Sequence, residues 1–123
     1  MLHRVPHGFT FPSFAVGTMW NLWFYGNGVE KICAYRLIDP KVDLVTKKCK
    51  VNHSRCRTVF TRMIQIAAEN NIIARSQDLN KANDQRVYEI AFNKLLDEIY
   101  GARMPSRPDS LNINTIGNRI YKK

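Results

Sequence analysis

Residues 52–67 read NHSRCRTVFTRMIQIA, and this stretch decides the fold because its apolar residues recur with the period of an α-helix. The residues of the apolar face are Cys56, Val59, Phe60, Met63, Ile64 and Ala67. The residues of the opposite face are Arg55, Thr58, Arg62 and Gln65, with Arg57 and Thr61 at its margin. The pattern predicts an amphipathic helix over residues 53–73, with Asn52 or Ser54 as its N-cap.

Upstream, a second apolar stripe predicts a helix over residues 13–25. Its members, Val16, Met19, Trp20 and Trp23, follow the spacing i, i+3, i+4, i+7. Ser13 is the expected N-cap, and the sequence Gly-Asn-Gly at 26–28 is the expected stop. Large aromatic side chains usually anchor a core, so we expect the tryptophans to be buried; exposed stacking on nucleobases is the alternative.

Downstream, QRVYEIAFNKLLDEIY predicts a helix over residues 84–100, with Gly101 at its C-terminal cap. Its apolar side comprises Val87, Ile90, Ala91, Leu95 and Ile99. After Pro105 and Pro108, a short helix is predicted over residues 110–122, capped by Asp109 or Ser110. Gly117 inside it costs about 1 kcal/mol relative to alanine, so this helix needs tertiary support. We expect residues 29–39 to form a short helix or strand and VTKKCKVNH, at 45–53, a basic loop.

The length and these elements predict one all-α domain over residues 1–123. A chain of 123 residues is long enough for one core and short for two. The expected architecture has four or five helices, with a trihelical core of the helix-turn-helix or Myb type and additional C-terminal helices. No internal repeat or low-complexity segment is present in the sequence.

The charge is strongly basic and unevenly distributed. The formal net charge is +9, and from Lys41 to Arg62 seven basic residues face one acidic residue. Such an excess favours nucleic acid, an anionic membrane or an acidic protein as partner. No apolar run approaches the roughly 20 residues of a membrane span, so we expect no membrane association. The three cysteines form an odd, irregular set, which indicates a reducing compartment, cytosol or nucleus.

Metal and catalytic chemistry are weakly indicated. Cys49, His53 and Cys56, with Cys33 upstream, have the residue types of a zinc site, but their spacing matches no familiar finger signature. The sequence contains no phosphate-binding glycine loop and no nucleophile motif. We therefore expect no metal, no cofactor and no enzymatic activity.

A nucleic-acid surface uses the same segment differently. Lysines in a loop can follow phosphates, and arginines on one helical face can reach base edges in a major groove. The candidate DNA-binding residues are Lys47, Lys48, Lys50, His53, Ser54, Arg55, Arg57, Arg62 and Arg119. Arg119 is included because NTIGNR, at 114–119, is similar to the start of helix-turn-helix recognition helices. The alternatives are RNA binding, a helical protein-interaction module whose basic face meets an acidic partner, and a merely solvated basic surface.

Four motifs together resemble a known group of proteins: MWNLWFYGN (19–27), YRLID (35–39), HSRCRTVFTRMI (53–64) and TIGNRIYKK (115–123). The pattern is similar to uncharacterised oomycete proteins. Those proteins in turn resemble the C-terminal DNA-binding domain of yeast glycolytic-gene activators, which is also attached to Crypton-type tyrosine recombinases. The resemblance implies a nuclear, sequence-specific DNA-binding domain with roles in transcription regulation or mobile elements. It also implies a structural tryptophan helix and DNA contacts from Ser54, Arg55 and Arg57. The yeast-type domains carry a second Trp-Arg pair, where this chain has Asp43-Leu44 and lysines.

Overall fold

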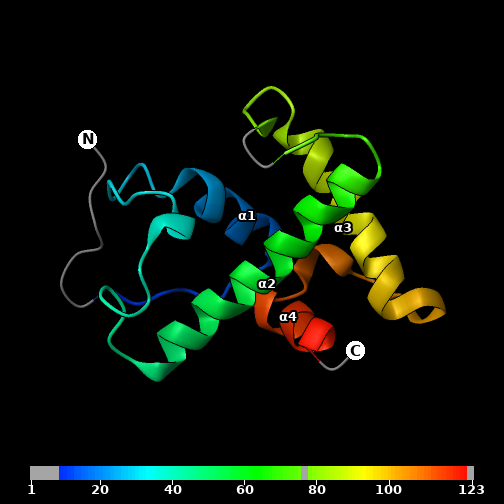
Figure 1. Ribbon diagram of the computed structural model, residues 1–123. Helices are drawn as coiled ribbons and strands as arrows, with labels where there is room; N and C mark the ends of the chain where they lie inside the picture. Colours follow the sequence, from blue (N-terminus) through cyan, green and yellow to red (C-terminus); the bar gives the residue numbers. More distant parts are fainter. Residues whose placement is uncertain (1–8, 76–77, 122–123) are drawn as a thin grey trace.

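A long central helix organises the structure (Figure 1). The structure is a computed structural model, and it describes residues 9–75 and 78–121. Within these residues the chain forms four α-helices: α1 (Val16–Tyr25), α2 (Lys47–Glu69), α3 (Asp84–Tyr100) and α4 (Ile113–Tyr121). Short 3-10 turns lie between α1 and α2, at Tyr35–Leu37, and between α3 and α4, at Gly101–Arg103 and Pro108–Ser110. The predicted all-α class is confirmed.

The helix α2 is the element against which the others pack. Its 23 residues span about 34 Å. Near its N-terminal end, Arg55 lies against Gly117 of α4, and further along Arg62 pairs with Glu98 of α3. The buried side chains of all four helices form one core. A change in α2 therefore reaches every other helix.

The helix α2 begins earlier than predicted. It starts at Lys47 rather than residue 53 and ends at Glu69 rather than residue 73. Thr46, and neither Asn52 nor Ser54, is the N-cap, because its side-chain oxygen accepts a hydrogen bond from the Cys49 backbone N–H at 3.1 Å. Of the segment predicted as a basic loop, residues 47–53 thus form about the first two turns of the helix, and only Val45 and Thr46 precede it.

The tryptophan helix α1 confirms the expected core role of Trp20 and Trp23, both of which are buried. Their rings lie 5.8 and 5.9 Å from the ring of Phe60, centroid to centroid. The helix begins three residues later than predicted, after Ala15. Ser13 is not its cap; the Ser13 hydroxyl instead donates to Asn112 Oδ1 at 2.7 Å.

The helix α3 has both of its predicted ends. Gly101 adopts a φ of 56° and its N–H donates to the Asp97 carbonyl, which ends the helix as expected. Val87, Ala91 and Leu95 are buried as predicted, together with Phe92 and Leu96.

The helix α4 starts at Ile113, three residues later than predicted, and residues 122–123 lie outside the described part. Asn112, rather than Asp109 or Ser110, caps it, since Asn112 Oδ1 accepts a hydrogen bond from the Asn114 N–H at 2.8 Å. A Cβ at Gly117 would lie 2.8 Å from Arg55 Cδ, so glycine here permits a close approach of α2 and α4. This contact is the tertiary support that the short helix needs.

The entry to α1 is fastened to the entry to α4. The Val16 N–H donates to the Leu111 carbonyl at 3.2 Å, and the Ile113 N–H donates to the Phe14 carbonyl at 2.9 Å. Asn112 Nδ2 also donates to the Ser13 carbonyl at 2.7 Å. We refer to these contacts, between residues 13–16 and 111–113, as the terminal clasp.

Candidate functional site

The lysines at the start of α2 project from a helical turn. Lys47, Lys48 and Lys50 are all exposed, and Arg57 is exposed two turns further on. Arg55 is half-buried because its aliphatic stem packs against α4 at Gly117. We call these five residues the basic face, although at 3.6 residues per turn they spread over about half the circumference of α2. Between Lys47 and Arg62 the chain contains no acidic residue.

Arg62 does not belong to this surface. Its Nη1 donates to Glu69 Oε1 at 3.0 Å, its Nε donates to Glu98 Oε2 at 3.1 Å, and its Nη2 also pairs with Glu98. These bonds, those to Glu98 foremost, raise the pKa of Arg62. The predicted role of Arg62 in reading bases is corrected, because its guanidinium is already occupied by two carboxylates.

His53 is buried and does not lie on the exposed surface. Its side chain is 1% exposed, and its ring packs 5.5 Å from Phe11 and 5.2 Å from Trp23, centroid to centroid. Burial, and secondarily the charge of Arg57, lower the pKa of His53. The ring is therefore held neutral inside the core, and its predicted contact with DNA is wrong for this structure. Ser54, its neighbour, is half-buried.

Arg119 lies apart from the lysine turn. It is exposed on α4, and its guanidinium carbon is 4.7 Å from the ring centroid of Tyr100, at the end of α3. This cation–π contact directs Arg119 toward α3. Of the nine candidate residues, four cations of α2 are exposed and Arg55 and Ser54 are half-buried. The other three are engaged elsewhere: His53 in the core, Arg62 with two glutamates and Arg119 with Tyr100.

The cysteines of α2 serve the core. Cys49 Sγ accepts a hydrogen bond from the Phe11 N–H at 3.3 Å, and Cys56 is fully buried. Burial raises the pKa of the Cys56 thiol, which keeps it protonated and makes it a poor nucleophile or metal ligand. Across the described part of the chain, no group of three or more His, Cys, Asp and Glu residues is arranged to hold a metal ion.

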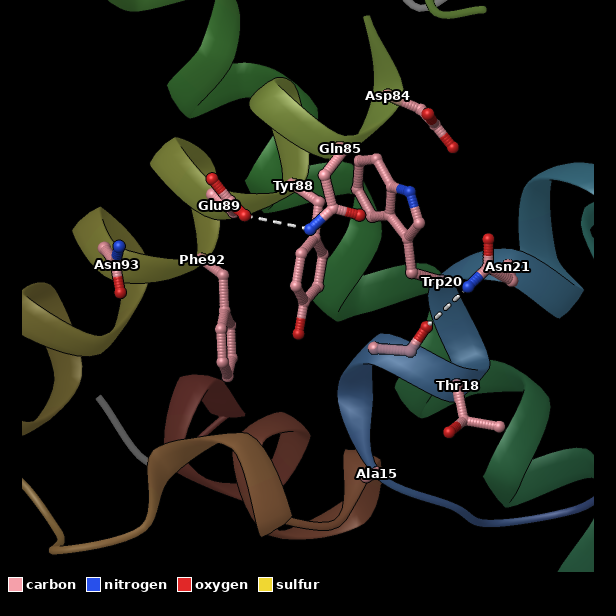
Figure 2. A pocket seen from close by; sticks show the side chains of 11 residues that line it. Ala15, Thr18, Trp20, Asn21, Asp84, Gln85, Tyr88, Glu89, Phe92 and Asn93 are labelled. Atoms are coloured by element: carbon pink, nitrogen blue, oxygen red, sulfur yellow. Dashed lines mark hydrogen bonds between the residues drawn. The ribbon is translucent and has the colours of Figure 1, made fainter. Parts of the chain in front are cut away.

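A cleft between α1 and α3 is a feature that the sequence did not predict (Figure 2). Its volume is about 650 Å³. Trp20 and Tyr88 contribute aromatic surface, Asp84 and Glu89 contribute carboxylates, and the remaining lining is mainly small or amide-bearing. Glu89 is exposed on α3. Only the docking of α1 beside α3 gives these side chains a common cavity.

No protein-family model, curated protein or solved structure matches this chain. The resemblance to the oomycete and yeast-type domains therefore stays a prediction. Within residues 9–75 and 78–121, no helix is both long enough and apolar enough to cross a bilayer.

Proposed function

We propose that this chain binds double-stranded DNA through the basic face of α2. The observation that carries the proposal is the composition of the first helical turn, which holds three lysines and no acidic residue. A helix N-terminus already carries partial positive charge, so lysines there oppose folding rather than assist it. An anionic partner accounts for this arrangement, because free backbone N–H groups and lysines then act on the same phosphates.

The residues of the basic face have different proposed roles in DNA binding. In this proposal the exposed Lys47, Lys48 and Lys50 contact phosphates, which would fix the position of α2 without reading sequence. Arg57 is exposed and is the member best placed to reach a base edge, where an arginine can bond guanine through two hydrogen bonds. Arg55, held against α4, would fix the angle between the two helices at the DNA. A nuclear location and a role in transcription or in mobile elements belong to the same proposal and rest on the resemblance.

A salt titration tests the phosphate contacts. Binding to a random duplex is measured by fluorescence anisotropy between about 50 and 200 mM salt, and four or five phosphate contacts give a log–log slope of about −4. The double variant Lys47→Ala/Lys50→Ala should reduce the magnitude of the slope by about 2. The matched control, Arg86→Ala/Lys94→Ala, removes the same charge from exposed positions on α3 and should leave the slope nearly unchanged.

A selection from a random-duplex pool tests the base contact. Arg57→Ala should weaken binding to a selected duplex more than to a random one, by about 1 to 3 kcal/mol. Equal weakening on both would restrict Arg57 to a phosphate role. Absence of micromolar binding to any duplex at low salt would end the DNA proposal.

A second candidate, a protein-interaction surface for an acidic partner, is favoured by one observation. Large apolar side chains are exposed near the lysine turn, including Val42 at 62% and Val45 at 87%. Phosphates give such side chains no contact, whereas a protein partner would bury them. Replacing both valines by serine should leave duplex binding unchanged if DNA is the partner. RNA is distinguished by repeating the salt titration with an RNA duplex of the same sequence.

A further inference from the structure

The cleft between α1 and α3 has the dimensions of a ligand site. Its volume of about 650 Å³ falls within the range of about 300 to 1,000 Å³ typical of small-molecule pockets. Tyr88 reaches from α3 to α1, where its hydroxyl oxygen would lie 3.1 Å from a Cβ at Gly17. The Tyr88 ring stacks on Phe92 with a centroid distance of 5.3 Å and an interplanar angle of 17°. None of the residues of the basic face lines it.

The charge of the cleft is opposite to that of the chain. Asp84 and Glu89 line it, and among the described residues that form its walls there is no lysine, arginine or histidine. Glu89 Oε1 accepts a hydrogen bond from Gln85 Nε2 at 2.9 Å, which fixes one carboxylate at the rim. In a protein of net charge +9, this concentrates negative potential at one concave place.

A buried donor lies in the wall of the same cleft. The Trp20 side chain is 2% exposed, and its indole N–H has no hydrogen-bond partner within the described residues. In Figure 2 the indole nitrogen lies on the side of the ring that faces Asp84 and Asn21. A buried N–H without an acceptor is destabilising and unusual, so it indicates a place where an acceptor from outside the chain would be favourable.

The chain itself places a cation beside this cleft. Lys81 Nζ lies 3.7 Å from the ring centroid of Tyr25. Burial and the neighbouring Asp84 carboxylate raise the pKa of Tyr25 to about 12. An aromatic ring next to one of the carboxylates of the cleft thus already holds an ammonium group by a cation–π contact.

We propose that the cleft binds a small organic cation that also carries an oxygen acceptor. The ammonium or guanidinium group pairs with Asp84 or Glu89 beside the Tyr88 ring, and a carbonyl or hydroxyl oxygen accepts from the Trp20 N–H. Neighbouring side chains cover that N–H, so one of them must move as the oxygen enters. This binding is independent of the basic face and of the proposed DNA binding.

A matched pair of probes tests the proposal on the full chain. Nα-acetyl-L-arginine amide carries a guanidinium and carbonyl oxygens, and Nα-acetyl-L-citrulline amide has nearly the same shape without the charge. In ¹H–¹⁵N spectra the arginine probe should give saturable shifts in α1 and α3 and at the Trp20 indole N–H. The citrulline probe should bind at least about tenfold more weakly, since it lacks the charge-assisted hydrogen bonds. Equal binding of both probes, or no saturation by about 10 mM of the arginine probe, would overturn the proposal.

Variants on α3 locate the cation. Asp84→Asn and Glu89→Gln should together weaken the arginine probe by about fivefold or more. The control, Asp97→Asn, removes a charge from the same helix at an exposed position outside the cleft and should leave the affinity unchanged. An equal loss in the control would mean general electrostatic attraction, and an unaffected Asp84/Glu89 double variant would mean binding elsewhere. Either result overturns the site.

Discussion

The first half of α2, residues 47–57, and the second half, residues 58–69, are built differently, although they belong to one helix. The buried residues of the first half are polar or sulfur-bearing: Cys49, Asn52, His53 and Cys56. The buried residues of the second half are all apolar: Val59, Phe60, Met63, Ile66 and Ala67. The surfaces differ too, since the lysines of the first half are exposed and form no ion pair with another described residue, whereas the arginine of the second half is bound to two glutamates.

This difference shows what each half contributes. The second half stabilises the fold by burying apolar area, which is non-directional and large. The first half is positioned by directional bonds: Asn52 Nδ2 donates to the Phe11 carbonyl at 3.0 Å, and Asn52 Oδ1 accepts from Asn114 Nδ2 at 2.8 Å. Such bonds fix where the basic face points while adding little net stability. The half that carries the proposed function is therefore oriented precisely rather than packed strongly.

The largest expected effect is in the second half. Phe60 is buried against Trp20, Trp23 and Phe24, and Phe60→Ala should lower the free energy of unfolding by about 3 to 5 kcal/mol, because it leaves a cavity. Urea unfolding followed by tryptophan fluorescence measures it. A loss below about 1 kcal/mol would contradict the assignment of the second half as the main source of burial energy.

In the first half, Asn52→Ala should cost about 1 to 3 kcal/mol, because the buried Phe11 carbonyl loses its donor and Asn114 loses an acceptor. Adding Asn114→Ala should cost less in the Asn52→Ala background than in the wild type. Additive losses in this double-mutant cycle would mean that the two amides do not act as a pair.

Of the two halves of α2, only the first contains a buried histidine, His53. Because the pKa of His53 is lowered in the folded state, the unfolded state binds the proton more readily below about pH 6.5. The stability is fully present above that pH and should fall with acidification, by at most about 1.4 kcal/mol per pH unit until the folded-state pKa is reached. The unfolding free energies of the wild type and of His53→Gln are measured over about three pH units, from about pH 8 to about pH 5. The difference between the two proteins should shrink as the pH falls. A constant difference would contradict a neutral buried ring.

The contact of α4 with the first half is tested by Gly117→Ala. The new Cβ would meet Arg55 Cδ at 2.8 Å and Arg55 Cβ at 3.1 Å, so we expect a net loss of about 1 kcal/mol despite the better helix propensity of alanine. Gly28→Ala is the control, since nothing lies within 4 Å of a Cβ there. A stabilised Gly117→Ala variant would show that the helices can separate freely.

The smallest effect distinguishes the arginines of the two halves. Arg62→Ala should lower the unfolding free energy by at most about 1 kcal/mol, because its side chain is 28% exposed and solvent screens its ion pairs. Arg62→Ala should leave the affinity for duplex DNA unchanged. Arg57→Ala should lower that affinity and leave the unfolding free energy unchanged. Thermal unfolding and anisotropy on the same two proteins decide it, and a weaker duplex complex with Arg62→Ala would remove the distinction.

Local signals predicted the elements that local interactions determine. The ends of α3 were predictable because Gly101 and the apolar period are adjacent in sequence, and the tryptophan stripe of α1 was predictable for the same reason. The start of α2 was missed because its first turn buries only Cys49 and depends on the Thr46 cap. His53 lies three residues before Cys56 and seven before Phe60, so its burial could have been inferred from the period.

The remaining errors come from contacts between distant residues. Arg62 and Glu98 are 36 residues apart, and nothing near either of them indicates the pair. The cleft likewise needs α1 and α3 to meet, and Asn112 is also bonded to Ser13, which is 99 residues away. Charge patterns therefore located the basic segment, but only the tertiary structure shows which of its residues are accessible.

The terminal clasp has a consequence for the order of folding. The clasp joins Ala15 to Asn112, and Asn52 accepts a hydrogen bond from Asn114. The contacts of the first half of α2 are therefore incomplete until α4 has been synthesised. During translation, α2 and α3 can meet through contacts that are closer in sequence, while the lysine turn still lacks a fixed direction. A ribosome-bound chain ending before residue 111 should therefore show a collapsed apolar core and a loosely oriented basic helix.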